Sequence, residues 1–305
     1  MRVGLTLPHY GFSLPGRTMT VADTVAWAVR AEDLGFDSVW ISDHFLFSLG
    51  RYGGDPGPVD ALEPITALAA IATATERVRM GTLVLGAPFR PAAITAHLAT
   101  TLSALSGGRF DLGLGSGWYA EDFEPFGYAM GTVGTRFALL EDLRARIEEP
   151  IAAAGVPVWI GAKGGDRALR LVARRGDGWN TAWRIDREAY AAKVARLRAF
   201  AAEMGAPAPR LSVGLYAIVG EDEADLGRRL DAMRSWLPGA AADLDAFRGD
   251  ALVGTVAACA ERLAWFADLG VEEVIVAPAT VPFAIPDDGI VDLIARELIP
   301  RARQR

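Results

Sequence analysis

One pattern of apolar and polar residues recurs along the chain. A helical stretch ends at a glycine, and an apolar run typical of a strand follows within a few residues, as in RAEDLGFDSVWIS and WFADLGVEEVIVA. The glycines are Gly35, Gly155, Gly176 and Gly270, and each stands where a left-handed helix C-cap favours glycine. The apolar runs are nearly continuous, which is typical of parallel strands covered on both faces. The pattern therefore predicts alternating helices and parallel strands.

Eight strands alternate with helices in this interpretation, which is the count of a (β/α)8 barrel, or TIM barrel, of the α/β class. We expect strands near residues 2–7, 37–42, 78–85, 110–115, 157–161, 177–181, 211–219 and 273–277. We expect helices near residues 20–34, 61–75, 91–106, 135–153, 166–175, 187–204, 222–236, 255–269 and 287–303. The barrel would span residues 1–305 as one domain. The alternative, an open doubly wound sheet, favours a GxGxxG turn after the first strand, and LTLPHYGFSLPG contains none.

Two connections in this scheme are long. Residues 43–60 follow the second strand and residues 116–134 follow the fourth. Right-handed crossovers bring the C-terminal ends of all the strands to one mouth of the barrel, so both loops belong to the rim of that mouth. Long loops at such a rim are usually functional. We therefore expect the active site there.

Composition and charge restrict the function. Hydrophobic residues make up 51% of the chain, and the formal net charge is −7. That charge argues against non-specific binding to nucleic acid or to an anionic membrane. The N-terminal segment MRVGLTLP has no signal-peptide pattern. The single cysteine, Cys259, lies in an apolar run and cannot form an intramolecular disulfide, which fits a protein of the reducing cytoplasm.

Histidine is scarce, so each position is informative. His9 follows the first expected strand and His44 the second, which places both at the mouth. Asp43 and His44 form a pair that could transfer a proton at neutral pH, but Asp43 could equally cap the loop while His44 packs under it. A metal-dependent barrel hydrolase would need a His-x-His pair at the first strand, and LPHYG offers one histidine. We therefore expect no metal site.

Glycines mark two further segments. Gly113, Gly115 and Gly117 alternate along and just past the fourth strand, which indicates either close approach of a planar ligand or tight packing in the barrel. The turn at residues 162–165 opens a helix, and its free amide groups could bind a phosphate with help from Lys163 and Arg167. The same residues are equally consistent with an ordinary turn between a strand and a helix that binds no phosphate.

Four stretches, taken in order, resemble the luciferase-like monooxygenase superfamily and, within it, the coenzyme F420-dependent oxidoreductase branch. The most specific is RVRMGTLVLGAPFRPAAITAHLATTLSALSGGRFDLGLGSGWYAEDFEPFG, residues 77–127, which is similar to the family's third strand, third helix and fourth strand. The others are GFDSVWISDHF, PVWIGAKGGDRALRLVARRGDGWN and LVGTVAACAERLAWFADLGVEEVIV. The resemblance covers nearly the whole chain.

The resemblance implies a flat redox cofactor across the mouth, coenzyme F420 or, as the alternative, FMN. The ring would lie beside the Asp43–His44 pair, over a bulge that often holds a non-proline cis peptide, and the phosphate would lie at the turn after the fifth strand. The implied cofactor contacts are Asp43, Thr82, Leu83, Val84, Leu85, Gly117, Ala162, Lys163, Gly164, Gly165, Asp177 and Trp179. His44 would be the catalytic residue that exchanges a proton during hydride transfer. The implied substrate pocket consists of His9, Phe45, Phe47, Trp118 and Tyr119.

Departures from the family pattern bear on the substrate. Branch members that act on sugar phosphate have a glutamate where this chain has Trp118, and a tryptophan where it has Ser48. These differences favour a small, apolar organic substrate over a sugar phosphate. Most relatives also have glutamate where Asp122 stands, which we interpret as a minor change.

Other functions stay open from the sequence alone. The chain could be a two-component monooxygenase that uses reduced FMN and oxygen, or a barrel that binds a flavin without catalysis. In either enzymatic case a separate reductase would supply the reduced cofactor. Apolar exposed faces expected on helices 61–75 and 91–106 favour a homodimer.

Overall fold

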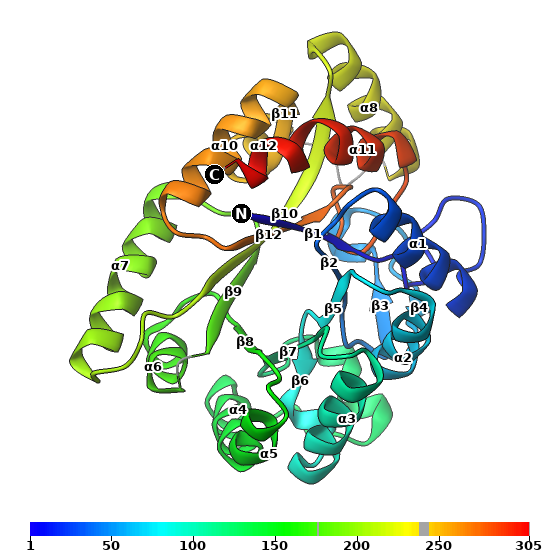
Figure 1. The fold of residues 1–305 in the computed structure, drawn as a ribbon. Coiled ribbons are helices and arrows are strands. Elements are labelled where there is room, and N and C mark those ends of the chain that lie inside the picture. The colour runs from blue at the N-terminus through cyan, green and yellow to red at the C-terminus, as the bar shows by residue number, and fades with distance from the viewer. Residues whose placement is uncertain (176, 238–243, 305) are drawn as a thin grey trace.

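Eight parallel strands close into a barrel in this computed structural model, which describes residues 1–175, 177–237 and 244–304. The last strand pairs with the first, so the open doubly wound alternative does not hold. Figure 1 shows the helices arranged around the outside of the strands. The barrel strands, in spatial order, are β1 (Arg2–Thr6), β2 (Ser38–Ile41), β5 (Arg79–Thr82), β7 (Phe110–Gly115), β8 (Val158–Gly161), β9 (Gly178–Trp183), β10 (Leu211–Gly220) and β12 (Glu273–Ala277).

The helices begin and end where local chemistry favours it. Thr20 forms a capping box with Asp23 at the start of the first helix, and Thr255 caps a later one. The α-helices are α1 (Val21–Asp33), α2 (Pro64–Ala74), α3 (Ala92–Leu105), α4 (Val133–Arg146), α5 (Glu148–Ala153), α6 (Asp166–Arg175), α7 (Arg187–Glu203), α8 (Glu223–Trp236), α9 (Leu244–Asp250), α10 (Val256–Asp268), α11 (Asp288–Leu293) and α12 (Ile299–Arg303). Short 3-10 turns are η1 (Gly50–Tyr52), η2 (Ala87–Phe89), η3 (Ala120–Asp122) and η4 (Glu124–Phe126).

Three of the four predicted C-cap glycines are confirmed. Gly35, Gly155 and Gly270 have φ angles of 85°, 63° and 86°, the left-handed conformation that glycine adopts without steric cost. Gly176 lies outside the described residues. These three glycines thus terminate helices, and the chain continues from each of them into the next strand.

Two long predicted helices are interrupted. The helix expected over 135–153 is α4 and α5, separated at Ile147, and the one expected over 287–303 is α11, a π-helical turn (Ile294–Leu298) and α12. Each second part contains a proline, Pro150 and Pro300. Proline has no backbone N–H to donate to the preceding turn, so the regular helical ladder breaks there.

Three short strands lie outside the prediction. β3 (Leu46–Ser48) and β4 (Pro58–Asp60) form an antiparallel hairpin within the long loop 43–60. β11 (Leu252–Thr255) extends the parallel sheet beside β10. Strands of three or four residues carry too little periodic pattern to be read from the sequence.

The third predicted strand, residues 78–85, is interrupted by a bulge. β5 ends at Thr82, a cis peptide joins Leu83 to Val84, and β6 (Leu85–Gly86) resumes pairing with β7. A Cβ atom added to Gly115 or Gly161 would lie 2.4 or 2.6 Å from the Val84 side chain. These close approaches show that Gly115 and Gly161 permit tight packing around the bulge.

The N-terminal ends of the strands enclose a polar cluster. Glu273 is 1% exposed, accepts a hydrogen bond of 2.5 Å from Ser38 and lies 3.4 Å from the guanidinium of Arg2. Burial raises the pKa of the Glu273 carboxyl to about 6. Asp111 forms an ion pair of 2.7 Å with Arg79 in the same end of the barrel. We call this group the basal cluster.

No helix within the described ranges is long and apolar enough to cross a membrane.

Candidate active site

A cavity of about 560 Å³ opens at the C-terminal mouth of the barrel, and we call it the mouth cavity. It lies between the two long loops and the ends of the strands, as the sequence predicted for the active site. Its lining residues are Tyr10, Ser42, Asp43, His44, Phe47, Arg51, Tyr52, Leu83, Val84, Gly86, Phe89, Gly115, Ser116, Gly117, Trp118, Asp122, Gly161, Ala162, Lys163, Asn180, Thr181, Ala182, Trp183, Pro282 and Phe283.

His44 lies in the cavity wall and is held by Asp122. The Nδ1 atom of His44 lies 2.5 Å from one carboxylate oxygen of Asp122, whose other oxygen accepts the backbone N–H of Phe45 at 2.9 Å. The His44 side chain is 12% exposed and that of Asp122 only 3%. A carboxylate accepts, so Nδ1 donates, and in the corresponding neutral tautomer Nε2 carries the lone pair. No described residue bonds to Nε2, which leaves this nitrogen available to a ligand.

Sequence reasoning missed the role of Asp122. The two side chains are 78 positions apart, and Asp122 belongs to η3 in the loop after β7. The replacement of the family's glutamate at this position was interpreted as minor. A carboxylate in the loop after a neighbouring strand was the signal that could have paired it with His44.

Asp43 has a structural partner beside the mouth. Its carboxylate accepts hydrogen bonds from Arg90 at 2.6 and 3.0 Å and from the backbone N–H of Gly86 at 2.8 Å. Arg90 also binds Glu63, the N-cap residue of α2. Asp43 lines the cavity, but its charge is already neutralised, so it fixes the β2 end to the bulge.

The expected ring contacts divide between the cavity and the core. Leu83, Val84 and Gly117 line the mouth cavity. Thr82 and Leu85 do not line it, because both are buried in the barrel; the Thr82 hydroxyl bonds to the backbone of β7. A flat ligand in this cavity would therefore meet the cis-peptide bulge and Gly86, and not Thr82 or Leu85.

The turn before α6 forms the other end of the cavity. Ala162 and Lys163 line the mouth cavity, and the Lys163 ammonium donates to the carbonyl of Ala182. Gly164 has φ 81° and fits closely beneath Trp179, whereas a Cβ at Gly165 would meet no atom within 4 Å. Open space next to the N-terminus of a ten-residue helix suits an anionic group.

Asp177 and Trp179 lie behind this turn and do not line the mouth cavity. Asp177 forms a buried bidentate ion pair with Arg144, with both bonds at 2.8 Å. Trp179 is fully buried and donates from Nε1 to the carbonyl of Ala162 at 2.9 Å. The structure gives both residues a supporting position, in contrast to the cofactor contact expected from the resemblance.

The expected substrate residues also divide. Phe47 and Trp118 line the cavity, but Phe45 and Tyr119 do not. Phe45 stacks in a separate aromatic group, and Tyr119 packs behind His44 at a ring distance of 5.4 Å. Five further aromatic lining residues were not predicted: Tyr10, Tyr52, Phe89, Trp183 and Phe283.

His9 was also expected in the substrate pocket, but it is fully buried behind the wall. Its ring bonds to the Leu7 carbonyl at 3.0 Å and to the Ser42 hydroxyl at 2.9 Å. Burial lowers the pKa of His9 to about 3, so the ring is neutral. A residue directly after a strand can point into the core as easily as into the mouth, and the sequence did not distinguish these.

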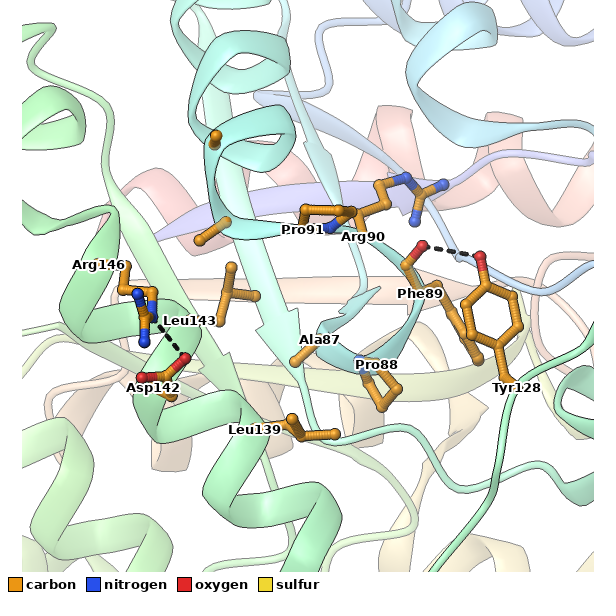
Figure 2. A pocket seen from close by; sticks show the side chains of 12 residues that line it. Ala87, Pro88, Phe89, Arg90, Pro91, Tyr128, Leu139, Asp142, Leu143 and Arg146 are labelled. Atoms are coloured by element: carbon orange, nitrogen blue, oxygen red, sulfur yellow. Dashed lines mark hydrogen bonds and ion pairs between the residues drawn. The ribbon is translucent and has the colours of Figure 1, made fainter.

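A second hollow, the outer groove, lies outside the barrel and measures about 710 Å³. Figure 2 shows the Asp142–Arg146 ion pair on one side and the Tyr128–Phe89 hydrogen bond on the other, with the Arg90 guanidinium pointing away from the ion pair. Phe89 lines both hollows, so η2 separates them. The histidine and the bulge face the mouth cavity alone, which makes that cavity the candidate active site.

Within the described ranges, no three His, Cys, Asp or Glu side chains gather as they would around a metal ion.

The family model described as luciferase-like monooxygenase matches residues 1–149 and 133–273. The chain is 37% identical over 140 residues to an F420-dependent glucose-6-phosphate dehydrogenase of Amycolatopsis mediterranei, an alignment that covers 46% of this chain and 40% of the relative. A protein of the same name from Beutenbergia cavernae is 30% identical over 252 residues, 74% of this chain and 72% of the relative. The chain thus spans about two fifths of the first of these relatives.

Two solved structures share the fold. An F420-dependent secondary alcohol dehydrogenase in complex with an F420-acetone adduct superposes with a TM-score of 0.75, at 17% identity and 99% coverage of both chains. The oxygenating constituent of 3,6-diketocamphane monooxygenase of Pseudomonas putida, in complex with FMN, superposes with a TM-score of 0.72, at 18% identity and coverage of 99% and 98%. At these identities the likeness concerns the barrel.

Proposed function

The chain belongs to the luciferase-like monooxygenase family, and we propose that it is a coenzyme F420-dependent oxidoreductase that moves a hydride between the deazaflavin and a small, apolar organic substrate. The relatives from Amycolatopsis and Beutenbergia, both named as F420-dependent dehydrogenases, support the cofactor. The observation that carries the proposal is the free Nε2 of His44 in the wall of the mouth cavity, beside the Leu83–Val84 bulge.

The residues around the cavity fit such a cofactor. Leu83 and Val84 offer an apolar surface for one face of a flat ring, and the turn at Lys163 and Gly165 offers amides, a cation and open space for its phosphate. The bound deazaflavin would supply the two-electron hydride chemistry. The cavity would hold the substrate's reacting carbon against the ring, which is the larger part of such catalysis.

His44 would handle the proton that accompanies the hydride. In oxidation, the substrate's hydroxyl proton passes to Nε2 while its carbon-bound hydrogen leaves as hydride; in reduction both steps reverse. Asp122 holds the imidazole by Nδ1, so Nε2 faces the substrate in one tautomer, and its negative charge stabilises the ring when it becomes protonated.

The wall of the cavity favours an apolar substrate. Phe47, Tyr52, Trp118, Trp183 and Phe283 surround the space. Trp118 stands where the sugar-phosphate enzymes have a glutamate, and Arg51 covers its ring at 4.4 Å. An aromatic wall gains from burying hydrocarbon and loses by stripping water from a sugar. This composition supports a substrate other than glucose 6-phosphate.

One experiment tests the cofactor and the reaction together. The purified protein is titrated with coenzyme F420 and with FMN, and each loaded form is then screened against alcohols, ketones, imines and aldehydes by cofactor absorbance. We expect tighter binding of coenzyme F420 and a substrate-dependent absorbance change. Binding without any absorbance change would favour a non-catalytic flavin-binding barrel.

The FMN-bound structural neighbour keeps a second candidate in view, a two-component monooxygenase that uses reduced FMN and oxygen. Tighter binding of FMN, with oxygen uptake in the presence of substrate, would favour this candidate. In both candidates we propose that a separate reductase delivers the reduced cofactor. The cytoplasmic location expected from the sequence stays a prediction.

We also propose a homodimer through α2 and α3. Neither helix contains a charged residue, and Ile94 and Leu105 on α3 are 50% and 49% exposed. An uncharged helical face with exposed aliphatic side chains suits a second copy of the chain. Sedimentation should give a dimer for the wild type and a monomer for Ile94→Glu; a wild-type monomer at micromolar concentration would exclude this interface.

A further inference from the structure

One cation of the mouth cavity has no negative partner among the described residues. Arg51 belongs to η1, in the long loop 43–60, and lines the cavity. Its guanidinium lies 4.4 Å over the ring of Trp118, which belongs to the long loop 116–134. Most arginines in the described ranges form a hydrogen bond or an ion pair, whereas Arg51, Arg174 and Arg187 form neither. Of these three, only Arg51 lines the mouth cavity.

The other charged side chains of the cavity wall are already bonded. Its two carboxylates, Asp43 and Asp122, are paired with a guanidinium and an imidazole respectively. Lys163 donates to a backbone carbonyl, at the end of the cavity where we place the cofactor phosphate. The charge of Arg51 is therefore the one that a ligand in the substrate space could neutralise.

The contact with Trp118 leaves the hydrogen-bonding groups of Arg51 unused. A guanidinium carries five N–H donors in a planar fork that matches the two oxygens of a carboxylate. An aromatic ring attracts the cation by its electron-rich face but offers no lone pair in the ring plane to these donors. Trp118 can thus hold the Arg51 side chain in place while its N–H groups stay without an acceptor among the described residues.

We propose that Arg51 is a specificity-determining residue that binds a carboxylate of the substrate, so that the substrate is a carboxylic acid with an apolar body. The ring of Trp118 contacts Arg51 and also lies 5.7 Å from the imidazole of His44. The carboxylate would be held at Arg51 and the reacting carbon beside His44, with the apolar body between them. The inference rests on the proposed function and specifies its substrate class.

A carboxylate suits this position better than a phosphate. One guanidinium neutralises a single negative charge, whereas a phosphate monoester carries up to about two at neutral pH. Arg51 is exposed at the rim, so a carboxylate there keeps part of its water while it pairs. Phe47 and Phe283 enclose the space behind it and are buried, and they would cover the hydrocarbon part.

The test compares an acid with its neutral counterpart. Cyclohexanecarboxylate and cyclohexanecarboxamide share one apolar ring, and neither carries an alcohol or a ketone for hydride transfer. Each is titrated into protein loaded with coenzyme F420, with cofactor fluorescence as the readout. We expect the wild type to bind the carboxylate about 10-fold more tightly, the effect of a charge-assisted bidentate pair. Arg51→Met should remove this preference and leave the carboxamide within about twofold.

Two further variants separate charge recognition from a structural role. Arg187 also lies over a tryptophan, Trp265, at 5.6 Å, but it belongs to α7 and does not line the mouth cavity. Arg187→Met is therefore the matched control and should keep the preference. Arg51→Lys retains the charge and loses the fork, so it should retain only part of the preference. Added sodium chloride should reduce the preference of the wild type and have little effect on Arg51→Met.

The contradicting outcomes are distinct. The assignment would be overturned by equal losses for both ligands in Arg51→Met, by an unchanged preference, or by a wild type that binds the carboxylate no better than the carboxamide. A larger loss of carboxylate binding in Gly165→Asp than in Arg51→Met would also overturn it, because the acid would then occupy the turn before α6. Failure of coenzyme F420 to bind would instead overturn the proposed function. In that case the same titrations by ligand-observed NMR on the protein alone still decide the role of Arg51.

Discussion

The two ends of the barrel both bury carboxylates, but they use them differently. At the mouth, Asp122 and Asp43 each engage a neighbouring side chain, and Asp122 leaves one atom of its partner His44 free toward a cavity. In the basal cluster, Glu273 is bonded to Ser38 and Asp111 to Arg79 at the opposite end of the barrel. At the mouth, the bond to Asp122 orients His44 so that its Nε2 is available to a ligand. At the base, the bonded carboxylates only support the fold.

The chain has a net charge of −7, yet we propose an anion site at the turn before α6. The carboxylates of Asp122 and Asp43 are already engaged, while Lys163 lines the mouth cavity and the space beside Gly165 is open. Local arrangement, and not overall charge, decides what the site attracts. We expect changes at the mouth to affect turnover or cofactor binding, and changes at the buried His9 and Glu273 to affect stability.

The largest expected effect is at His44. His44→Ala should lower turnover by ~10²–10⁴, because the proton transfer loses its positioned acid–base group, while cofactor affinity stays within severalfold. Steady-state kinetics and cofactor fluorescence measure the two quantities separately. His97→Ala, at the exposed histidine of α3, is the control. Unchanged turnover in His44→Ala would remove this residue from catalysis.

Gly165→Asp should weaken cofactor binding by roughly 10- to 100-fold, because a carboxylate would face the phosphate in space that is now open. Gly165→Ser occupies the same space without charge and should bind nearly as the wild type does. Fluorescence titration with coenzyme F420 gives both affinities. Equal affinities for the two variants would refute an anion site at this turn.

His9 should make the protein sensitive to acid. The native ring has a pKa of about 3, against 6.5 when unfolded, so the unfolded chain binds the extra proton. The stability from this residue is present above pH 6.5 and is lost as the pH falls toward 3, by about 2 kcal/mol at pH 5. Denaturant unfolding of wild type and His9→Gln should diverge over this range, and parallel curves would contradict a neutral buried His9.

Glu273 should give a smaller dependence of the opposite sign. Its native pKa is about 6, against 4.5 in the unfolded state, so the native protein holds the proton more tightly. The stability from this group is present below pH 4.5 and is lost as the pH rises through 6, by about 1–2 kcal/mol. Glu273→Gln should flatten that change in denaturant unfolding and leave turnover unaltered. A loss of turnover would tie the basal cluster to the site.

The sequence was a good guide where physical causes are local. Glycine C-caps at Gly35, Gly155 and Gly270 and the apolar runs after them were enough to predict the barrel, because both depend on a few consecutive residues. The sequence was a poorer guide to the direction in which a side chain points. His9 and His44 each follow a strand, yet one enters the core and the other the cavity.

Contacts between segments that are distant along the chain could not be predicted from the sequence. Asp177 stands in a segment expected to contact the cofactor. It instead forms a bidentate ion pair with Arg144 of α4 and does not line the mouth cavity. Asp122 was interpreted as a minor replacement and proves to hold His44. In each case the decisive partner lies more than thirty positions away.

The sequence by itself determined the eight-stranded barrel, the end at which the site lies and the family resemblance, because periodicity, caps and motif order are properties of neighbouring residues. The tertiary structure alone decided which of the candidate side chains share a cavity and which atoms of them are free. That difference arises because a hydrogen bond between loops of separate strands depends on how the whole barrel closes, and no short stretch of chain encodes it.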